Sequence, residues 1–94
     1  MNPRKPIRKK SKAKAKQDRV YNILAKAFLI ANPKCAVCGR PATEVHHIRP
    51  RSVRPDLVCD PDNFLAVCKV SHQFIHDHPA LSYIRGHLKR STDL

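Results

Sequence analysis

Five of the six histidines in this sequence lie between positions 46 and 78, and the spacing of two of them suits metal binding. His72 and His76 are four residues apart, so on a helix their side chains share one face with Cβ atoms about 5 to 6 Å apart. Two imidazoles placed in this way can bind one metal ion. Because the spacing is common, a pair of exposed helix histidines is the alternative interpretation.

A second pair of histidines, His46 and His47, lies in a segment rich in β-forming residues. We expect a strand over residues 43–48, in which successive side chains point to opposite sides. One histidine could then join the metal while the other faces a substrate and acts as a general base, since a neutral imidazole can do either. The alternative is one packed and one solvated strand histidine.

Three stretches of the chain, at residues 44–50, 62–68 and 71–76, together resemble the HNH nuclease motif. That motif has a His near the end of one strand, an Asn that opens a second strand, and a His on the following helix. The doubled histidine, the later Asn63 and the His-x-x-x-His also resemble the nuclease domains of the DNase colicins. The Cys-x-x-Cys ahead of them resembles small phage-encoded HNH proteins, and the resemblance covers about residues 35–78.

The resemblance implies a role for each residue of this set. His46, His72 and His76 would hold one catalytic divalent metal, which could be Mg, Mn, Ni or Zn, and the metal would stabilise the leaving oxygen. His47 would take the proton from the attacking water. Asn63 would hold the loop and orient His47, or contact the metal as in some members of the family. The family typically leaves a 5′ phosphate.

Four cysteines could form a second, structural metal site. The Cys-x-x-Cys pair is Cys35 and Cys38, and many HNH proteins add a second such pair to hold zinc. Here the second pair would be Cys68 and position 71, but position 71 is Ser71, a poor zinc ligand beside thiolates. Cys59 could be the fourth ligand, three thiolates could bind zinc with water or another group, or the cysteines could pack without metal.

The positive charge of the chain is concentrated at its N-terminus. Residues 1–19 hold nine Lys or Arg side chains and one acid, a local net charge of +8 out of a total of +12. Such a run does not fold alone and attracts polyanions. Residues 1–17 are therefore expected to be a disordered arm that binds nucleic acid through phosphates, with a solubilising tail as the alternative.

We expect the cations that bind nucleic acid to lie in this arm and in the loop after the histidines. Arginine offers oxyanions a forked donor geometry, and Arg49 could reach the scissile phosphate. A solvated loop charge is an equally good interpretation for Arg51 and Arg54, and His78 and His87 read as structural or surface residues. The expected nucleic-acid-binding residues are Arg49, Arg51, Lys9, Lys10, Lys12 and Lys14.

The helices, strands and loops that position these residues can be predicted from the spacing of the apolar residues and from the positions of proline and glycine. Asp18 can cap a helix whose apolar stripe ends before Asn32-Pro33, and that stripe consists of Val20, Ile23, Leu24, Ala27, Phe28 and Ala31. A loop over 49–62, a second strand over 64–67 and a helix over 71–77 follow. A last helix can start at Pro79, with Leu81, Ile84 and Leu88 as its apolar members and Gly86 weakening it.

The sequence therefore predicts an α+β fold. It would have a small ββα-metal core, an N-terminal helix, a zinc-knuckle-like turn and a short C-terminal helix, in one domain over residues 18–94. A domain this small, with five aromatic residues, often needs a metal staple. With no apolar run that could span a bilayer and no secretory signal, we expect a cytoplasmic protein without membrane contact.

The leading functional hypothesis is a metal-dependent DNA endonuclease of phage or mobile-element origin, which either nicks one strand or cuts both. RNA as substrate and a phage protein as partner remain open, as does the oligomeric state. An HNH-fold protein that binds nucleic acid without hydrolysing it is the alternative. A third hypothesis is a protein that is stabilised by zinc and binds a partner protein. The incomplete cysteine set argues against it.

Overall fold

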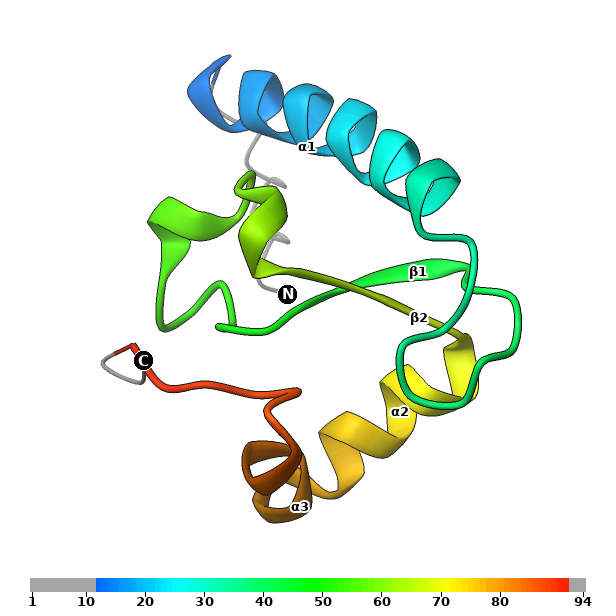
Figure 1. The fold of residues 1–94 in the computed structure, drawn as a ribbon. Coiled ribbons are helices and arrows are strands. Elements are labelled where there is room, and N and C mark those ends of the chain that lie inside the picture. The colour runs from blue at the N-terminus through cyan, green and yellow to red at the C-terminus, as the bar shows by residue number, and fades with distance from the viewer. Residues whose placement is uncertain (1–11, 92–94) are drawn as a thin grey trace, which may run out of the picture.

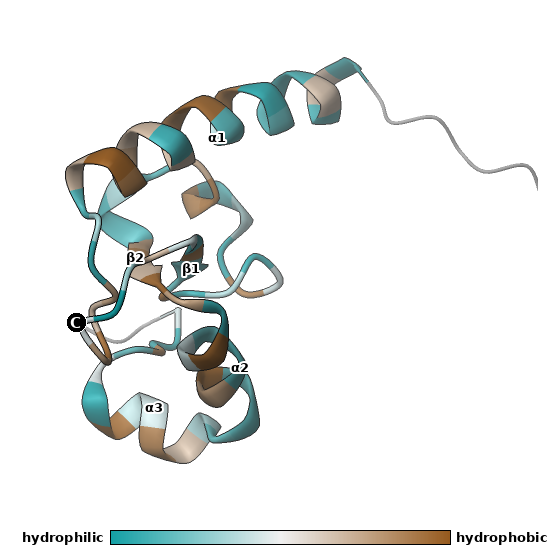
Figure 2. Cartoon of the chain, turned by 90° about the vertical axis from the view of Figure 1, so that its right-hand side faces the viewer, coloured by the Kyte–Doolittle hydropathy of each residue, from teal (hydrophilic) through white to brown (hydrophobic). Residues whose placement is uncertain are grey.

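The computed structural model of the chain describes residues 12–91 and has the expected α+β architecture (Figure 1). Its centre is a two-stranded antiparallel ribbon of β1 (Glu44–His47) and β2 (Phe64–Val67). Helix α1 (Lys12–Ala31) lies across one side of the ribbon, and α2 (Lys69–Asp77) and α3 (Pro79–Arg85) lie on the other side (Figure 2).

Helix α1 begins earlier than the sequence predicted. It starts at Lys12 rather than at Asp18, so residues 12–17 of the expected arm are helical, whereas residues 1–11 lie outside the described residues. Alanine and lysine are good helix formers, and Lys14 pairs with Asp18 one turn on, with Nζ 3.7 Å from Oδ1. The helix ends as predicted before Asn32-Pro33, where the Asn32 backbone N–H still donates to the Phe28 carbonyl at 2.8 Å.

The packed face of α1 differs from the predicted stripe. Four of the six predicted members, Val20, Ile23, Ala27 and Ala31, are exposed. Tyr21, which is not among those six, is half-buried together with Leu24 and Phe28. The difference is caused by contacts between aromatic rings. Tyr21 and Phe28, two turns apart, both pack edge-on against Phe64 of β2, with ring centroids 5.8 and 5.4 Å away. The helix is therefore rotated toward its aromatic residues.

The two strands lie almost where the sequence predicted them. Their register pairs His46 with Leu65 and His47 with Phe64. The connecting loop contains two short 3₁₀ turns, Pro55–Leu57 and Pro61–Asn63, each starting at a proline. Proline suits the first position of a helical turn because its fixed φ is already helical and its missing N–H would have had no partner there.

The last two helices are short and joined by His78. Helix α2 starts at Lys69, two residues before the predicted start, because Cys68 caps it by accepting from the Ser71 N–H. Helix α3 ends at Gly86, whose φ of 80° lies in the left-handed region that glycine adopts at low cost. The predicted helical member Leu88 therefore lies beyond α3, and Ile84 is exposed rather than packed.

The segment after α3 turns back along the end of β1 and closes the small core. Its Lys89 N–H donates to the Ile48 carbonyl at 2.9 Å. Leu88 is buried there with Cys35, Val67 and Ile75. This core joins the cysteine turn, the second strand, α2 and the C-terminal segment, so the chain on both sides of the histidines is fixed by the same few side chains.

Candidate functional site: a histidine cluster beside a cysteine cluster

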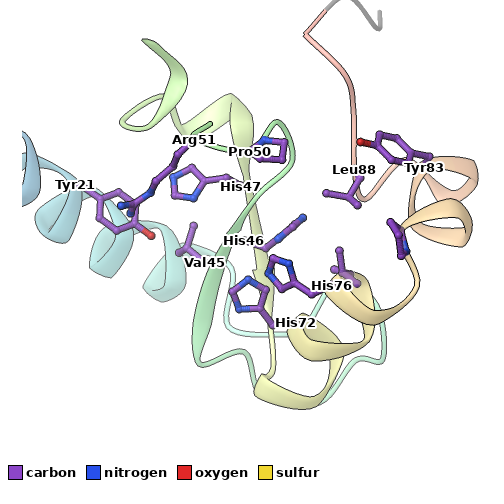
Figure 3. Close-up of a pocket in the computed structure, with 12 residues that line it drawn as sticks. Tyr21, Val45, His46, His47, Pro50, Arg51, His72, His76, Tyr83 and Leu88 are labelled. Carbon is purple, nitrogen blue, oxygen red and sulfur yellow. The ribbon is translucent and has the colours of Figure 1, made fainter. Parts of the chain in front are cut away.

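The alternation of side chains along β1 separates the two adjacent histidines, as the sequence predicted. His46 points toward α2, where its ring centroid lies 5.2 Å from that of His72 and 5.9 Å from that of His76. His47 points toward α1, where its ring lies 5.3 Å from that of Tyr21. Both histidines nevertheless line one cavity, because they lie at the end of the strand (Figure 3).

The three histidines on the α2 side form a group that could hold a metal ion. One ring nitrogen from each of His46, His72 and His76 lies within 4.8 Å of the others. The i, i+4 spacing on α2 puts the rings of His72 and His76 4.9 Å apart, on the face that meets β1. The residues that the sequence selected as metal ligands are thus brought together.

His46 is held by a hydrogen bond that leaves only one of its ring nitrogens with a lone pair. Its Nε2 lies 2.8 Å from the His87 carbonyl oxygen. Because a carbonyl only accepts, Nε2 carries the hydrogen, and Nδ1 is the atom left with a lone pair. The side chain is buried, and burial lowers its pKa from 6.5 to about 4 against the opposing effect of the His87 hydrogen bond. His46 is therefore neutral at pH 7, as a metal ligand must be.

His72 is oriented by a carboxylate that the sequence analysis did not select. Its Nδ1 lies 3.3 Å from Oε2 of Glu44, so Nδ1–H donates and Nε2 keeps its lone pair. A carboxylate behind a ligating histidine fixes the tautomer and raises the basicity of the ligand. The signal was present in the sequence, because Glu44 is two residues before His46 and shares its side of the strand.

His47 is positioned by the loop that follows it. Its Nε2 lies 3.0 Å from the Val58 carbonyl oxygen, so Nε2 is the donor and Nδ1 is unprotonated. Burial, aided by the nearby positive charge of Arg51, lowers the pKa of His47 below its ordinary value despite the hydrogen bond to Val58. A neutral imidazole with a bare Nδ1 at the edge of a cavity is able to accept a proton.

Asn63 is buried and ties down the loop after the histidines. Its Oδ1 accepts from the Arg49 N–H at 2.7 Å, and its Nδ2 donates to the carbonyls of Arg49 at 3.0 Å and Leu57 at 3.5 Å. The amide thus spans the loop that carries Val58, the acceptor of His47. This placement agrees with the loop-holding role that the resemblance implied rather than with contact to a metal.

The basic residues divide between the cavity and other parts of the surface. Arg51 lines the cavity, whereas Arg49 directs its Nε to the Arg90 carbonyl at 3.2 Å and Arg54 pairs with Asp56. The residue predicted to reach a phosphate, Arg49, is therefore not the arginine at the cavity. Lys12 and Lys14 lie on the exposed first turn of α1, and Lys9 and Lys10 lie outside the described residues.

The cavity beside the histidines measures about 450 Å³. Its walls come from α1, β1, the following loop, α2, α3 and the C-terminal segment. Apart from the four histidines and Arg51, they are apolar or aromatic. Figure 3 shows Tyr21 on one side of the histidines and Tyr83 with Leu88 on the other.

Three of the four cysteines form a second group that could hold a metal ion. The sulfur atoms of Cys35, Cys38 and Cys68 lie within 4.8 Å of one another, and those of Cys38 and Cys68 are 3.5 Å apart. All four cysteines are free thiols. Cys59 is not in this group, because its Sγ lies 3.7 Å from the Gln17 carbonyl of α1. The structure therefore does not bring Cys59 to the other three sulfur atoms.

Ser71 occupies the place beside this group that a fourth cysteine would have had. It is buried, and its Oγ lies 3.3 Å from Sγ of Cys68. Burial raises the pKa of Cys35, but hydrogen bonds from the Ser71 hydroxyl and from neighbouring backbone groups outweigh it and lower the pKa to about 6. The same hydroxyl is the main cause of the lowered pKa of Cys68. The turn thus favours thiolates, the form that binds metals.

Comparisons of the chain with protein-family models, curated proteins and solved structures find no match. None of the helices between residues 12 and 91 combines the length and apolarity needed to cross a bilayer.

Proposed function

We propose that this protein is an HNH-type, metal-dependent endonuclease that hydrolyses DNA phosphodiester bonds. The observation that carries the proposal is the pairing of the His46, His72 and His76 group with His47 in one cavity. Three imidazoles suit a divalent metal, and a fourth imidazole beside them suits a general base. Phosphodiester hydrolysis needs both, because water is a weak nucleophile and the departing alkoxide is a poor leaving group.

The donor set fits a single divalent metal. His46 offers Nδ1 and His72 offers Nε2, because their other nitrogens are committed to His87 and Glu44. His76 completes the group from the next turn of α2. When bound, the metal supplies Lewis-acid stabilisation of the charge on the phosphate and leaving oxygens. Imidazole ligands favour Zn or Ni, whereas Mg and Mn depend more on oxygen ligands from phosphate and water.

His47 accepts the proton of the attacking water at Nδ1. Its Nε2–H donates to Val58, which holds the ring and disperses the positive charge that develops on protonation. Because the pKa of His47 is lowered, the ring is already neutral at pH 7. Asn63 acts on this step only through the loop, by fixing the backbone that carries Arg49 and Leu57.

Nucleic acid as substrate is supported by the distribution of charge. Helix α1 carries Lys12, Lys14, Lys16 and Arg19 toward its N-terminal end, and Arg51 lies at the cavity that α1 also lines. Cations placed in this way neutralise phosphates without reading the sequence of bases. The full chain has a net charge of +12, which favours a polyanionic substrate.

We assign the cysteine group a structural role, with zinc bound by Cys35, Cys38 and Cys68. Cys35 is buried in the core beside Val67 and Ile75, whereas Cys38 is exposed and Cys68 is half-buried. Zinc there would brace the start of α2, which carries His72 and His76. Three thiolates beside a hydroxyl are the chemistry that supports zinc over harder cations.

The alternative function is a protein that binds nucleic acid without hydrolysing it. A binding module has no need of a histidine held in a neutral form with its Nδ1 toward a cavity beside a metal-ligand group. The paired hydrogen bonds of His46 and His47 to carbonyl groups therefore favour the enzyme.

The proposal is tested by a plasmid-nicking assay with Mg, Mn, Ni and Zn in turn. Wild-type protein should cut, and His47→Ala should lose at least about a hundredfold in rate, the usual contribution of a general base, while still binding metal. His78→Ala is the matched control, since His78 is exposed and packs on Phe74 outside the cavity. Equal activity of wild type and His47→Ala, including no cutting by either protein with any metal, would refute the enzyme.

A further inference from the structure

Two tyrosines flank the histidine cavity from opposite sides. Tyr21 comes from α1 and Tyr83 from α3, and both line the cavity with the histidines between them (Figure 3). The remaining walls are largely aliphatic, from Val45, Ile75 and Leu88. A cavity with aromatic and aliphatic walls is a poor match for a sugar–phosphate backbone alone, which is polar and charged.

Each of these tyrosines carries an arginine over its ring. The guanidinium carbon of Arg51 lies 5.0 Å from the ring centroid of Tyr21, and that of Arg90 lies 5.6 Å from that of Tyr83. Stacking of this kind places a cation at the rim of the cavity next to an aromatic surface. Aromatic platforms alternating with cations are the means by which proteins bind unpaired strands, since bases stack on rings and phosphates meet cations.

An intact duplex could not use the aromatic walls. Its bases are paired and stacked on one another, so only its grooves and backbone would meet the cavity mouth. An unpaired nucleotide can place its base against a tyrosine while its phosphate stays near Arg51 or Arg90. The base would then occupy part of the cavity of about 450 Å³, against its aromatic and aliphatic walls, rather than leave those walls facing a charged backbone.

We propose that the cavity binds unpaired bases of single-stranded DNA, with Tyr83 as the stacking platform and with Arg51 and Arg90 facing the phosphates on either side. The inference rests on the proposed function, because the same histidines would act on a phosphate of the bound strand. It adds a preference: the chain acts on unpaired segments rather than on intact duplex.

The two tyrosines differ in their other contacts, and this difference determines which of them should be mutated. The ring of Tyr21 also packs on Phe64 and His47, so its removal would disturb both the fold and the proposed general base His47. Tyr83 is 40% exposed and lies near the end of the short helix α3. Tyr83→Leu removes the platform while keeping an apolar side chain, and Tyr83→Phe keeps the platform.

The experiment measures binding of a labelled mixed-sequence strand and of its duplex by fluorescence anisotropy. The probes carry phosphorothioate linkages, so that cleavage is suppressed without a chelator that would remove bound metal. Wild-type protein should bind the single strand more tightly than the duplex. Tyr83→Leu should weaken single-strand binding by about tenfold, the effect expected from the loss of one stacked base, and leave duplex binding unchanged. Tyr83→Phe should bind as wild type does.

Ile84→Ala is the matched control, because Ile84 neighbours Tyr83, is 82% exposed and does not line the cavity. It should bind both probes as wild type does. Unchanged single-strand binding by Tyr83→Leu would overturn the inference, and so would an equal loss for strand and duplex.

Tyrosine emission gives a second readout. The chain has two tyrosines and no tryptophan, so in Tyr21→Phe all tyrosine emission comes from Tyr83. Stacking of an oligothymidylate should quench it in that variant. Emission that stays constant, after correction for absorption by the oligonucleotide, would contradict stacking on Tyr83.

The outcomes separate this inference from the proposed function. Single-strand binding that depends on Tyr83, in a protein that cuts nothing with any metal, would support the stacking site and refute the nuclease. Metal-dependent cutting of duplex and single strand at equal rates, unaffected by Tyr83→Leu, would support the nuclease and refute the stacking site.

Discussion

The Nε2 atom of His46 lies 2.8 Å from the carbonyl oxygen of His87 and so links the first strand to the segment after the last helix. The link crosses 41 positions of the sequence and leaves Nδ1 as the nitrogen with a lone pair. The ring centroid of His46 lies 5.2 Å from that of His72 and 5.9 Å from that of His76. The metal-ligand geometry thus depends on a backbone group that belongs to none of the HNH-like stretches.

This burial of His46 predicts how the metal-free protein responds to acid. The pKa of His46 is about 4 in the folded chain and about 6.5 when unfolded, so the unfolded state binds the proton first. The contribution of His46 to the free energy of unfolding is therefore fully present above pH 6.5. About 2 to 3 kcal/mol of it is lost as the pH falls toward 4. Urea titrations at several pH values measure it.

The lowered pKa values of His47 and His87 act in the same direction. A His46→Gln variant should consequently keep only the smaller part of the acid sensitivity, whatever its stability at pH 8. If its free energy of unfolding depends on pH as steeply as that of wild type, His46 is not the group responsible.

Glu44 is predicted to set the metal affinity through His72. Replacing Glu44 by Ala removes the acceptor of Nδ1–H and should weaken metal binding about 10- to 100-fold, as expected for a carboxylate behind a ligating histidine. Glu44→Gln keeps an acceptor oxygen and should lose less. Calorimetric titration with Zn or Ni measures the affinity, with Asp62→Asn, an exposed acid elsewhere, as the control. Equal affinities of wild type and Glu44→Ala would show that the contact is incidental.

Asn63 is predicted to matter for both stability and rate. Asn63→Ala leaves the partly buried N–H and carbonyl of Arg49 without their side-chain partner, at a cost of about 1 to 3 kcal/mol in the free energy of unfolding. The freed loop no longer fixes Val58 against His47, so cleavage by the folded fraction should also fall. Asn63→Asp still accepts from Arg49, so its stability and cleavage rate should lie between those of wild type and Asn63→Ala. Wild-type stability in Asn63→Ala would contradict the loop-holding role.

Ser71 offers a gain-of-function prediction at the cysteine group. Ser71→Cys completes a four-thiolate set around a position that already lies beside Cys68, so zinc affinity should rise by about tenfold or more. Competition with a chromophoric chelator measures the change, and the cobalt-substituted protein should show the absorption of tetrahedral thiolate ligation. Ser71→Ala is the control and should gain nothing. An unchanged affinity in Ser71→Cys would place the metal, if any, elsewhere than among these sulfurs.

The sequence by itself determined the local part of this design. The His-x-x-x-His spacing required one helical face, and the adjacent histidines required opposite sides of a strand, because helix and strand geometry fix these directions over a few residues. The two strands, the end of the first helix at Asn32-Pro33 and the incomplete cysteine set at Ser71 followed in the same way.

Only the tertiary structure decided which distant groups complete the site. Packing turns α1 toward Phe64 and places Cys59 against the Gln17 carbonyl. Packing also places Arg51, rather than Arg49, at the cavity. The carbonyls of Val58 and His87 fix the tautomers of His47 and His46, and a carbonyl group is the same in every residue type. No pattern of residue types could have revealed them, because what distinguishes these two carbonyls is only where the folded chain places them.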